Sequence, residues 1–259
     1  MQPEHIKHIS EKFGRDITPL GPQDRFPFDH SACLDCSSAC CYSTDVLLSM
    51  HDIHRMKEAP ALTQTGTTIA RLFALGILRC YVGPESNAPL CIIETGKTNG
   101  RCSFIAAVCD PCTNEVQRTP DGKPKTLCAL GEHKPLRCKL YPLGRVTSLG
   151  KADKTPEQQM VLQNIMCRAT ETAKTVTLEE FYKSNHISQE ILQANLECME
   201  ALTAFHGKAI ARSRFYFYMG LMYDPDFITN VLGMEAGFSI ALALTKKFLS
   251  KEPFESTVH

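Results

Sequence analysis

The chain has 259 residues, of which 43% are hydrophobic and 22% are charged, and this near-average composition excludes the disordered and fibrous classes of protein. Lysine plus arginine equals aspartate plus glutamate at 28 each, so the net charge is zero and we expect no nucleic-acid partner. Asp226 and Glu235 interrupt the longest uncharged stretches of the C-terminal third, which fall well short of the roughly 20 residues of a membrane-spanning helix, so we also expect no membrane association.

The N-terminal part of the chain predicts short helices separated by breaks. The first 32 residues indicate a short helix followed by an extended segment, because two proline-containing turns interrupt the helical pattern. Ser49 and Asp52 resemble a helix cap and its capping-box partner, which predicts a helix over about 50–58. Apolar residues at helical spacing predict a second helix over about 64–78.

The middle of the chain is expected to be largely irregular. Residues 90–94 and 101–105 flank a Thr-Gly-Lys-Thr-Asn-Gly turn and predict one small hairpin. Between Asp110 and Pro142, repeated prolines interrupt every helical register, so we expect loops there.

The last third carries the strongest helical signals. A cap, a first-turn proline and a capping-box glutamine predict a helix over about 155–168, and Thr177 with Glu180 repeats the capping pattern. Two longer segments of helical periodicity follow, one beginning at Ser188 and one covering 224–242.

These signals predict a mainly α protein. An irregular cysteine-rich metal-binding region of short helices, loops and one small hairpin, over residues 28–150, would pack on a helical C-terminal region over residues 151–259. We expect the two regions to form one compact unit.

Thirteen cysteines dominate the chemistry of the chain. The first residues lack the basic-then-apolar pattern of a secretion signal, which predicts a cytoplasmic location where thiols stay reduced. In that compartment, clustered cysteines typically bind metals or carry out redox chemistry, and an odd number fits a disulfide framework poorly.

The first cysteine motif is Cys33-Leu-Asp-Cys36-Ser-Ser-Ala-Cys40-Cys41, which places four thiols within nine residues. Its Cys-x2-Cys turn can aim two sulfurs at one ion, and the following pair adds two more within reach, so the motif is typical of a metal site. Buried structural cysteines are the alternative interpretation, which the polar residues Asp35, Ser37 and Ser38 between the thiols disfavour.

Two later motifs extend this pattern, Cys102-Ser-Phe-Ile105 and Lys134-Pro-Leu-Arg-Cys138-Lys-Leu-Tyr-Pro142, the latter with Cys128 nine residues ahead of its cysteine. With the first motif, they resemble the YkgJ-type cysteine-cluster family, a zinc- or iron-chelating domain that also occurs in flagellin lysine N-methylases. The family pattern is Cys-x2-Cys-x2-Cys-Cys, then Cys-Pro-Phe-Leu, then Arg-Pro-x-x-Cys-Arg-x-[Tyr/Phe]-Pro. The chain departs from it by one extra residue in the first motif, by Lys134 in place of arginine and by an inserted loop over about 106–127.

The resemblance covers residues 28–168 and implies eight metal-ligating cysteines, enough for up to two four-thiolate sites. These residues are Cys33, Cys36, Cys40, Cys41, Cys102, Cys128, Cys138 and Cys167, of which the last corresponds to a family cysteine downstream of the motifs. We expect them to converge in space.

Four further cysteines lie in or beside the region that departs from the family pattern: Cys80, Cys91, Cys109 and Cys112. Cys109-Asp-Pro-Cys112 is itself a metal-type turn, so a further site there is a secondary hypothesis. Cys80 and Cys91 are either additional ligands or core residues. Cys198 shares a helix face with apolar residues and is interpreted as a core thiol.

Several polar residues have two interpretations each. His51 and His54 share a helix face and form either a ligand pair or a pair of surface histidines. His133 either contacts a metal centre or is exposed. Arg137 and Lys139 flank a motif cysteine and either offset the charge of a thiolate site or are solvated.

Thiolates suit zinc and iron–sulfur clusters alike. Zinc modules usually pair two Cys-x2-Cys knuckles about 15–20 residues apart, whereas the two knuckles of this chain, at 33/36 and 109/112, are separated by 72 residues. Adjacent Cys40 and Cys41 point in different directions and could serve neighbouring irons. We therefore expect one or more [4Fe–4S] clusters, with zinc as the alternative.

Three functions are consistent with these features. The first is an iron–sulfur protein that acts in electron transfer or redox chemistry with a protein or redox partner. The second is a zinc-stabilised interaction module. The third, implied only by the resemblance to flagellin lysine N-methylases, is a methyltransferase-like enzyme that uses S-adenosylmethionine. No dinucleotide fingerprint, phosphate loop or nucleophile elbow occurs, so the sequence identifies no catalytic residue.

Overall fold

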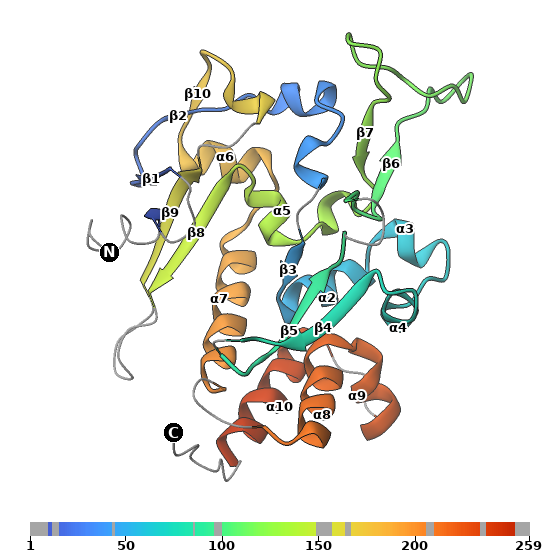
Figure 1. Cartoon of the computed structure of the whole chain (residues 1–259), viewed down its shortest axis with the longest axis vertical. Helices are drawn as coiled ribbons and strands as arrows, with labels where there is room; N and C mark the ends of the chain where they lie inside the picture. The colour runs from blue at the N-terminus through green and yellow to red at the C-terminus, as the bar shows by residue number, and fades with distance from the viewer. Residues whose placement is uncertain are drawn as a thin grey trace. The chain divides into compact units, whose positions relative to one another are not determined.

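The computed structural model describes residues 10–11, 16–42, 45–84, 86–95, 100–148, 157–163, 167–205, 210–233 and 237–251 (Figure 1). In these ranges the chain forms nine α-helices and ten strands, and the strands form four small antiparallel sheets. The prediction of a mainly α protein is therefore wrong, and the region predicted as short helices and loops contains strands β3 to β8. Every helix in the described ranges is too short or too polar to cross a bilayer.

The chain divides into two compact units, each assembled from three segments. Unit 1 contains Met1–Cys41, Ile105–Cys128 and Arg137–Ser188, whereas unit 2 contains Tyr42–Phe104, Ala129–Leu136 and Gln189–His259. The boundary predicted between residues 150 and 151 lies outside the described residues.

A three-stranded sheet in unit 1 has the order β1-β9-β8, with bounds Ile17–Leu20, Glu157–Gln163 and Leu143–Ser148. In its central strand, Leu162 faces Thr18 on one side and Leu143 on the other. The helix predicted over 155–168 is therefore wrong. Pairing with two neighbouring strands satisfies the backbone of β9, and this outweighs a local cap signal of about 1 kcal/mol.

Two smaller sheets complete the strands described in unit 1. They pair β2 (Phe26–Pro27) with β10 (Thr175–Val176), and β6 (Ile105–Ala107) with β7 (Thr126–Cys128). The extended chain predicted in the first 32 residues is confirmed by β1 and β2, while the helix predicted before it lies largely outside the described residues. The hairpin predicted from 90–94 and 101–105 is wrong, because residue 105 begins β6 and pairs with β7.

An aromatic core forms around helix α6 (Leu178–Ser184) of unit 1. The capping box predicted from Thr177 and Glu180 is confirmed at its first turn. The ring of Phe181 is fully buried and lies 5.6 Å from the ring of Phe26 and 4.8 Å from that of Phe28. These contacts join the α6 segment to the β2 segment, which enters the first cysteine motif.

In unit 2, a three-stranded sheet has the order β3-β5-β4, with bounds Val46–Leu48, Pro89–Ile93 and Leu78–Val82. The central strand β5 is apolar, since Cys91, Ile92 and Ile93 are all buried. A strand that is buried on both faces lacks the alternating pattern that identifies a half-exposed strand, so this pairing was not visible locally.

The helices of unit 2 largely follow the periodicity of the sequence. The predicted helices that begin near 50 and 188 are confirmed as α2 (Met50–Lys57) and α7 (Gln189–Thr203). The helix predicted over 64–78 is shorter, as α4 (Ile69–Ala74), since the chain turns at Gly76 with φ 68° and enters β4. The short helix α3 (Pro60–Thr63) precedes it.

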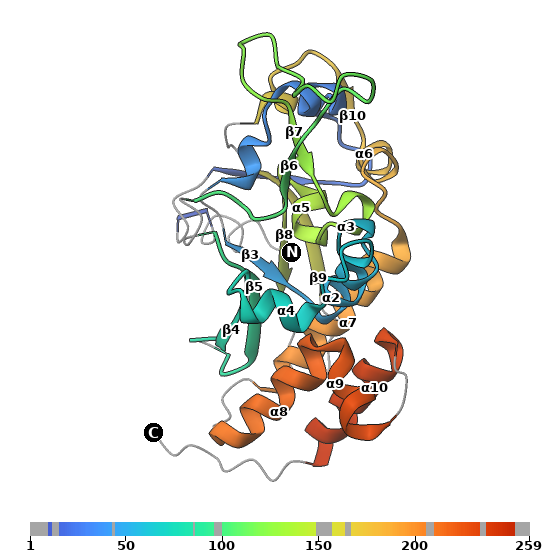
Figure 2. The ribbon, with the colours of Figure 1, turned by 90° about the vertical axis from the view of Figure 1, so that its right-hand side faces the viewer.

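Three helices at the C-terminal end of unit 2 lie side by side (Figure 2). Their bounds are Arg212–Tyr223 for α8, Pro225–Leu232 for α9 and Phe238–Lys251 for α10. The segment predicted as one helix over 224–242 is thus two helices, because Gly233 adopts a left-handed φ of 65° and caps α9. The ring of Phe217 lies 5.1 Å from that of Phe248 and helps to hold α8 and α10 together.

Candidate metal centre

The first cysteine motif forms two 3-10 turns joined by a tight reversal. Cys33 lies in η1 (His30–Asp35), which ends at Cys36, while Cys40 and Cys41 lie in η2 (Ala39–Cys41). Ser37 and Ser38 between them have φ values of 51° and 56°, in the left-handed region that redirects a chain within two residues. The Sγ atoms of Cys40 and Cys41 lie 3.9 Å apart. None of the 13 cysteines, all within the described ranges, forms a disulfide.

Cys167 reaches the same region of unit 1 from a distant part of the sequence. It caps η5 (Arg168–Thr170), and this turn lies against η1, because the N–H of Asp29 donates to the carbonyl of Ala169 at 2.7 Å. Burial is the main cause of the raised pKa of the Cys167 thiol, and the neighbouring thiols of Cys40 and Cys36 raise it further. Backbone N–H groups of η5 partly offset this effect. We call Cys36, Cys40, Cys41 and Cys167 the thiol cluster.

The serine turn attaches the thiol cluster to strand β7. The hydroxyl of Ser38 donates to the carbonyl of Thr126 at 2.9 Å, and the hydroxyl of Thr126 donates back to the Ser38 oxygen at 3.0 Å. Thr126 stands two residues before Cys128 in β7. The buried Oγ of Ser37 has no hydrogen-bond partner among the described residues. A buried hydroxyl without a partner costs about 1–3 kcal/mol, and it is available to donate to a bound thiolate or sulfide.

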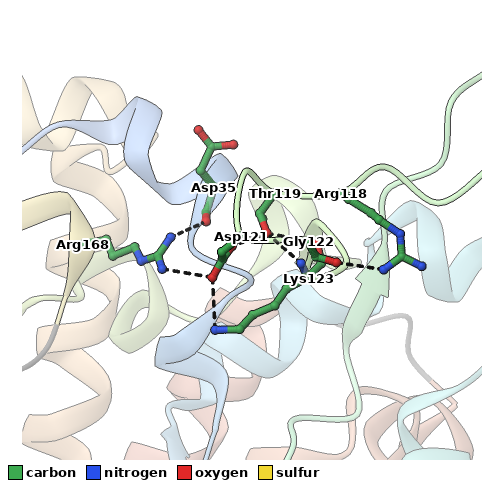
Figure 3. A network of polar contacts seen from close by, with 7 residues as sticks. All are labelled: Asp35, Arg118, Thr119, Asp121, Gly122, Lys123 and Arg168. Carbon is green, nitrogen blue, oxygen red and sulfur yellow. Dashed lines mark hydrogen bonds and ion pairs between the residues drawn. The ribbon is translucent and has the colours of Figure 1, made fainter.

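Basic and acidic side chains form a polar network between the 118–125 loop and the turns that carry Cys36 and Cys167 (Figure 3). The guanidinium of Arg168 donates to the carbonyl of Asp35 at 3.0 Å and pairs with the carboxylate of Asp121 at 3.3 Å. Lys123 also pairs with Asp121, whereas Lys125 pairs with the carboxylate of Asp35 at 3.0 Å. A hydrogen bond from the Thr119 hydroxyl is the main cause that lowers the pKa of Asp121 to about 2, with Lys123 adding to it. This network ties η1, η5 and the 118–125 loop together.

The residues named the thiol cluster are four of the eight cysteines that the family resemblance implies, and they lie in or at the ends of η1, η2 and η5. Cys33, Cys128 and Cys138 belong to the same unit, in η1, β7 and α5 (Leu136–Leu140), whereas Cys102 belongs to unit 2. Convergence of all eight stays a prediction. Across the described residues, no group of three cysteine, histidine, aspartate or glutamate side chains stands ready to hold a metal ion.

The remaining cysteines lie in other elements: Cys109 and Cys112 in unit 1, and Cys80, Cys91 and Cys198 in unit 2. Cys109 and Cys112 are exposed in the loop between β6 and β7, where the Asp110 carboxylate accepts the N–H of Cys112 at 2.9 Å. Cys80 and Cys91 face each other across β4 and β5 of unit 2. The core interpretation of Cys198 is confirmed: burial raises its pKa to about 12 and leaves the thiol 1% exposed.

Four histidine and lysine side chains, at positions 51, 54, 133 and 139, are at least partly buried or bonded to the backbone. His51 and His54 pack on Phe238 of α10, with ring centroids at 4.9 and 6.0 Å, and are half-buried. The Nδ1 of His133, in η4 (Gly131–His133), lies 3.0 Å from the carbonyl of Arg55. Lys139 is 1% exposed and donates to the carbonyl of His186 at 2.7 Å, so its interpretation as a solvated loop charge is wrong.

We expect unit 2 to lose stability as the pH falls from about 6.5 to about 4. Burial, with smaller effects of Lys57 and His51, lowers the pKa of His54 from 6.5 to about 4, and Asp226 opposes the shift. Above that range the imidazole is neutral in both states. Between these two pH values the unfolded chain binds a proton at His54 that the folded chain does not. The free energy of unfolding therefore decreases, by up to about 3 kcal/mol.

Urea unfolding of the wild type and of His54→Gln, above and below this pH range, measures the effect. The variant should lose less stability on acidification than the wild type does. Equal losses in the two proteins would show that other groups dominate the acid response.

The comparisons with known proteins assign no family to the chain: no family model, curated protein or solved structure matches it. The resemblance to YkgJ-type proteins therefore stays a prediction that depends on the quoted motifs. Sequence reasoning had identified the cysteines but missed Arg168 and the structural role of Ser37 and Ser38. The two consecutive serines between Cys36 and Cys40 were the only local signal of that turn.

Proposed function

We propose that unit 1 binds a metal centre through its thiol cluster, and that this centre is an iron–sulfur cluster of the [4Fe–4S] type. The observation that carries this proposal is the contact of η5 with η1, from opposite ends of the cysteine-rich sequence: Arg168, next to Cys167, donates to the carbonyl of Asp35, next to Cys36, at 3.0 Å. Distant thiols that gather without a disulfide are typical of metal ligation in a reducing compartment.

The surroundings of the thiol cluster support a bound thiolate centre rather than an apolar core. Four thiolates give a zinc ion or a [4Fe–4S] cluster a net negative charge. Arg168 and Lys125 contact the turns that carry the thiol cluster and pair with Asp121 and Asp35, so they would offset that charge by exchanging these partners. The orphaned hydroxyl of Ser37 is a donor of the kind that tunes metal-bound sulfur. Polar residues of this kind would be poor neighbours for thiols buried only for packing.

Binding would also complete the fold of unit 1. The thiol cluster joins η1, η2 and η5, which are short turns with few buried apolar side chains of their own. A structural thiolate site contributes on the order of 10 kcal/mol to the folded state, so ligation could close these turns around the metal. A [4Fe–4S] centre bound there would supply one-electron redox chemistry, for transfer to a redox partner or for a reaction on a protein partner.

One distance favours a second candidate, a zinc-stabilised interaction module. Zinc–sulfur bonds of 2.3 Å place the thiolates of a tetrahedral site about 3.8 Å apart, and the Sγ atoms of Cys40 and Cys41 are 3.9 Å apart. In a [4Fe–4S] cluster each thiolate binds a different iron, which requires these two sulfurs to separate. The identity of the metal is therefore the first property to measure.

Anaerobic purification of the full chain, followed by iron, zinc and acid-labile sulfide analysis, separates these candidates. We expect a brown protein with charge-transfer absorption and with iron and sulfide in equal amounts. Stoichiometric zinc without sulfide would reject the cluster and favour the zinc module. A protein that binds neither metal, even after reconstitution with iron and sulfide or with zinc, would reject the proposed function altogether.

A further inference from the structure

A pair of thiols lies within the β3-β5-β4 sheet of unit 2. Cys80 of β4 and Cys91 of β5 are direct partners in the register of two antiparallel strands. Both residues belong to the described part of the β3-β5-β4 sheet. Their relative position is therefore set by backbone pairing within one unit.

The hydrogen-bond pattern places this pair at the closest type of cross-strand position. The N–H of Gly83 donates to the carbonyl of Ala88 at 2.8 Å, and the N–H of Glu94 donates to the carbonyl of Ile77 at 2.9 Å. Hydrogen-bonded and non-hydrogen-bonded pairs alternate along an antiparallel ladder, so the Cys80–Cys91 pair, an odd number of steps from each, is non-hydrogen-bonded.

This position matches the reach of a disulfide. Cα atoms of a non-hydrogen-bonded pair lie about 4.5 Å apart, and disulfides join Cα atoms separated by about 4.4–6.8 Å. Side chains of such a pair also project from the same face of the sheet. Bond formation therefore requires side-chain rotation and little movement of the backbone.

The two thiols differ in their access to solvent. Cys91 is 0% exposed, whereas Cys80 is half-buried and open to small reagents. Burial raises the pKa of the Cys91 thiol, and the neighbouring Cys80 thiol raises it further. The hydroxyl of Tyr223 donates to the carbonyl of Pro89 at 2.9 Å. One accessible thiol beside one shielded thiol is the arrangement of an attacking and a resolving cysteine.

We propose that Cys80 and Cys91 form a reversible redox couple, a dithiol that converts to a cross-strand disulfide in the presence of a low-molecular-weight disulfide such as glutathione disulfide. The Cys80 thiolate attacks one sulfur of glutathione disulfide, which forms a mixed disulfide and releases one glutathione. The Cys91 thiol then loses its proton and attacks the Cys80 sulfur, which releases the second glutathione. Two protein thiols are oxidised and one glutathione disulfide is reduced to two thiols.

The oxidation state of both cysteines can be measured on one tryptic peptide. Trypsin cuts after Arg79 and Lys97, so Cys80 and Cys91 share one tryptic peptide, while Cys198 lies on another. The full chain is equilibrated with glutathione disulfide, quenched with acid, unfolded and alkylated. We expect the Cys80–Cys91 peptide to lose both alkyl labels and to be lighter by two hydrogens, and we expect dithiothreitol to restore both labels.

One variant tests the role of Cys91 as the resolving thiol, and one other cysteine of the chain serves as an internal control. In Cys91→Ala, which keeps the position apolar, Cys80 should hold one glutathione as a stable mixed disulfide, because no resolving thiol remains. The peptide of the buried Cys198 should stay labelled throughout. Two labels on the wild-type Cys80–Cys91 peptide after oxidation, or a cross-link from it to another peptide, would overturn the proposal. Both measurements are independent of metal content. Failure of this proposal can therefore be distinguished from failure of the proposed metal centre.

Discussion

Replacing Cys167 with serine should remove most of the bound metal and loosen unit 1. Cys167 is the thiol that η5 brings to the first motif, so its loss leaves the metal one ligand short and η5 untethered. A structural thiolate site is worth on the order of 10 kcal/mol, and we expect Cys167→Ser and Cys36→Ser each to lose a large part of it. Metal analysis of anaerobically purified protein and urea unfolding measure the two effects.

The matched control is Cys112→Ser, in the same unit. The Cys112 thiol is exposed, and the residue's hydrogen bond to Asp110 uses the backbone N–H, which the substitution leaves in place. This variant should bind metal as the wild type does. Full metal content in Cys167→Ser, or an equal loss in Cys112→Ser, would show that the thiol cluster is not the binding site.

Replacing Asp52 with alanine should destabilise unit 2 by about 4 kcal/mol, the largest effect expected from a residue outside the cysteines. Asp52 is 3% exposed, and its carboxylate accepts hydrogen bonds from both the N–H and the hydroxyl of Ser49 and from the N–H of Leu136. The substitution leaves two buried N–H groups without an acceptor, each at a cost of about 1–3 kcal/mol. Urea unfolding of the metal-loaded proteins measures the difference.

The corresponding capping box of α6 provides the control. Glu180 accepts the N–H of Thr177 at 2.7 Å in an exposed setting, so water can replace the lost acceptor in Glu180→Ala. We expect a loss of about 1 kcal/mol there. Similar losses in the two variants would mean that the buried contact of Asp52 with Leu136 contributes little. Asp52→Asn, which keeps one acceptor oxygen, should be intermediate.

Features that depend on a few neighbouring residues are predicted correctly from the sequence. Both capping boxes, at Ser49 and Thr177, form as the residue spacing predicts, since a cap is satisfied within one turn of the chain. The helices α2 and α7 also follow from local periodicity. The turn from Cys36 to Cys40 is local as well, whereas the thiolate chemistry that the cysteine spacing indicates stays a prediction.

The strand pairings and the contact between the turns that carry distant cysteines depend on tertiary structure. The segment 157–163 carries a helix-start signal, yet β1 and β8 flank it and satisfy its backbone as a strand. Likewise, the register of β4 and β5 pairs Cys80 with Cys91, and η5, which follows Cys167, contacts η1, which ends at Cys36. Such long-range pairing gains its energy from contacts that close only when remote segments assemble, and local residue patterns do not encode which segments will meet.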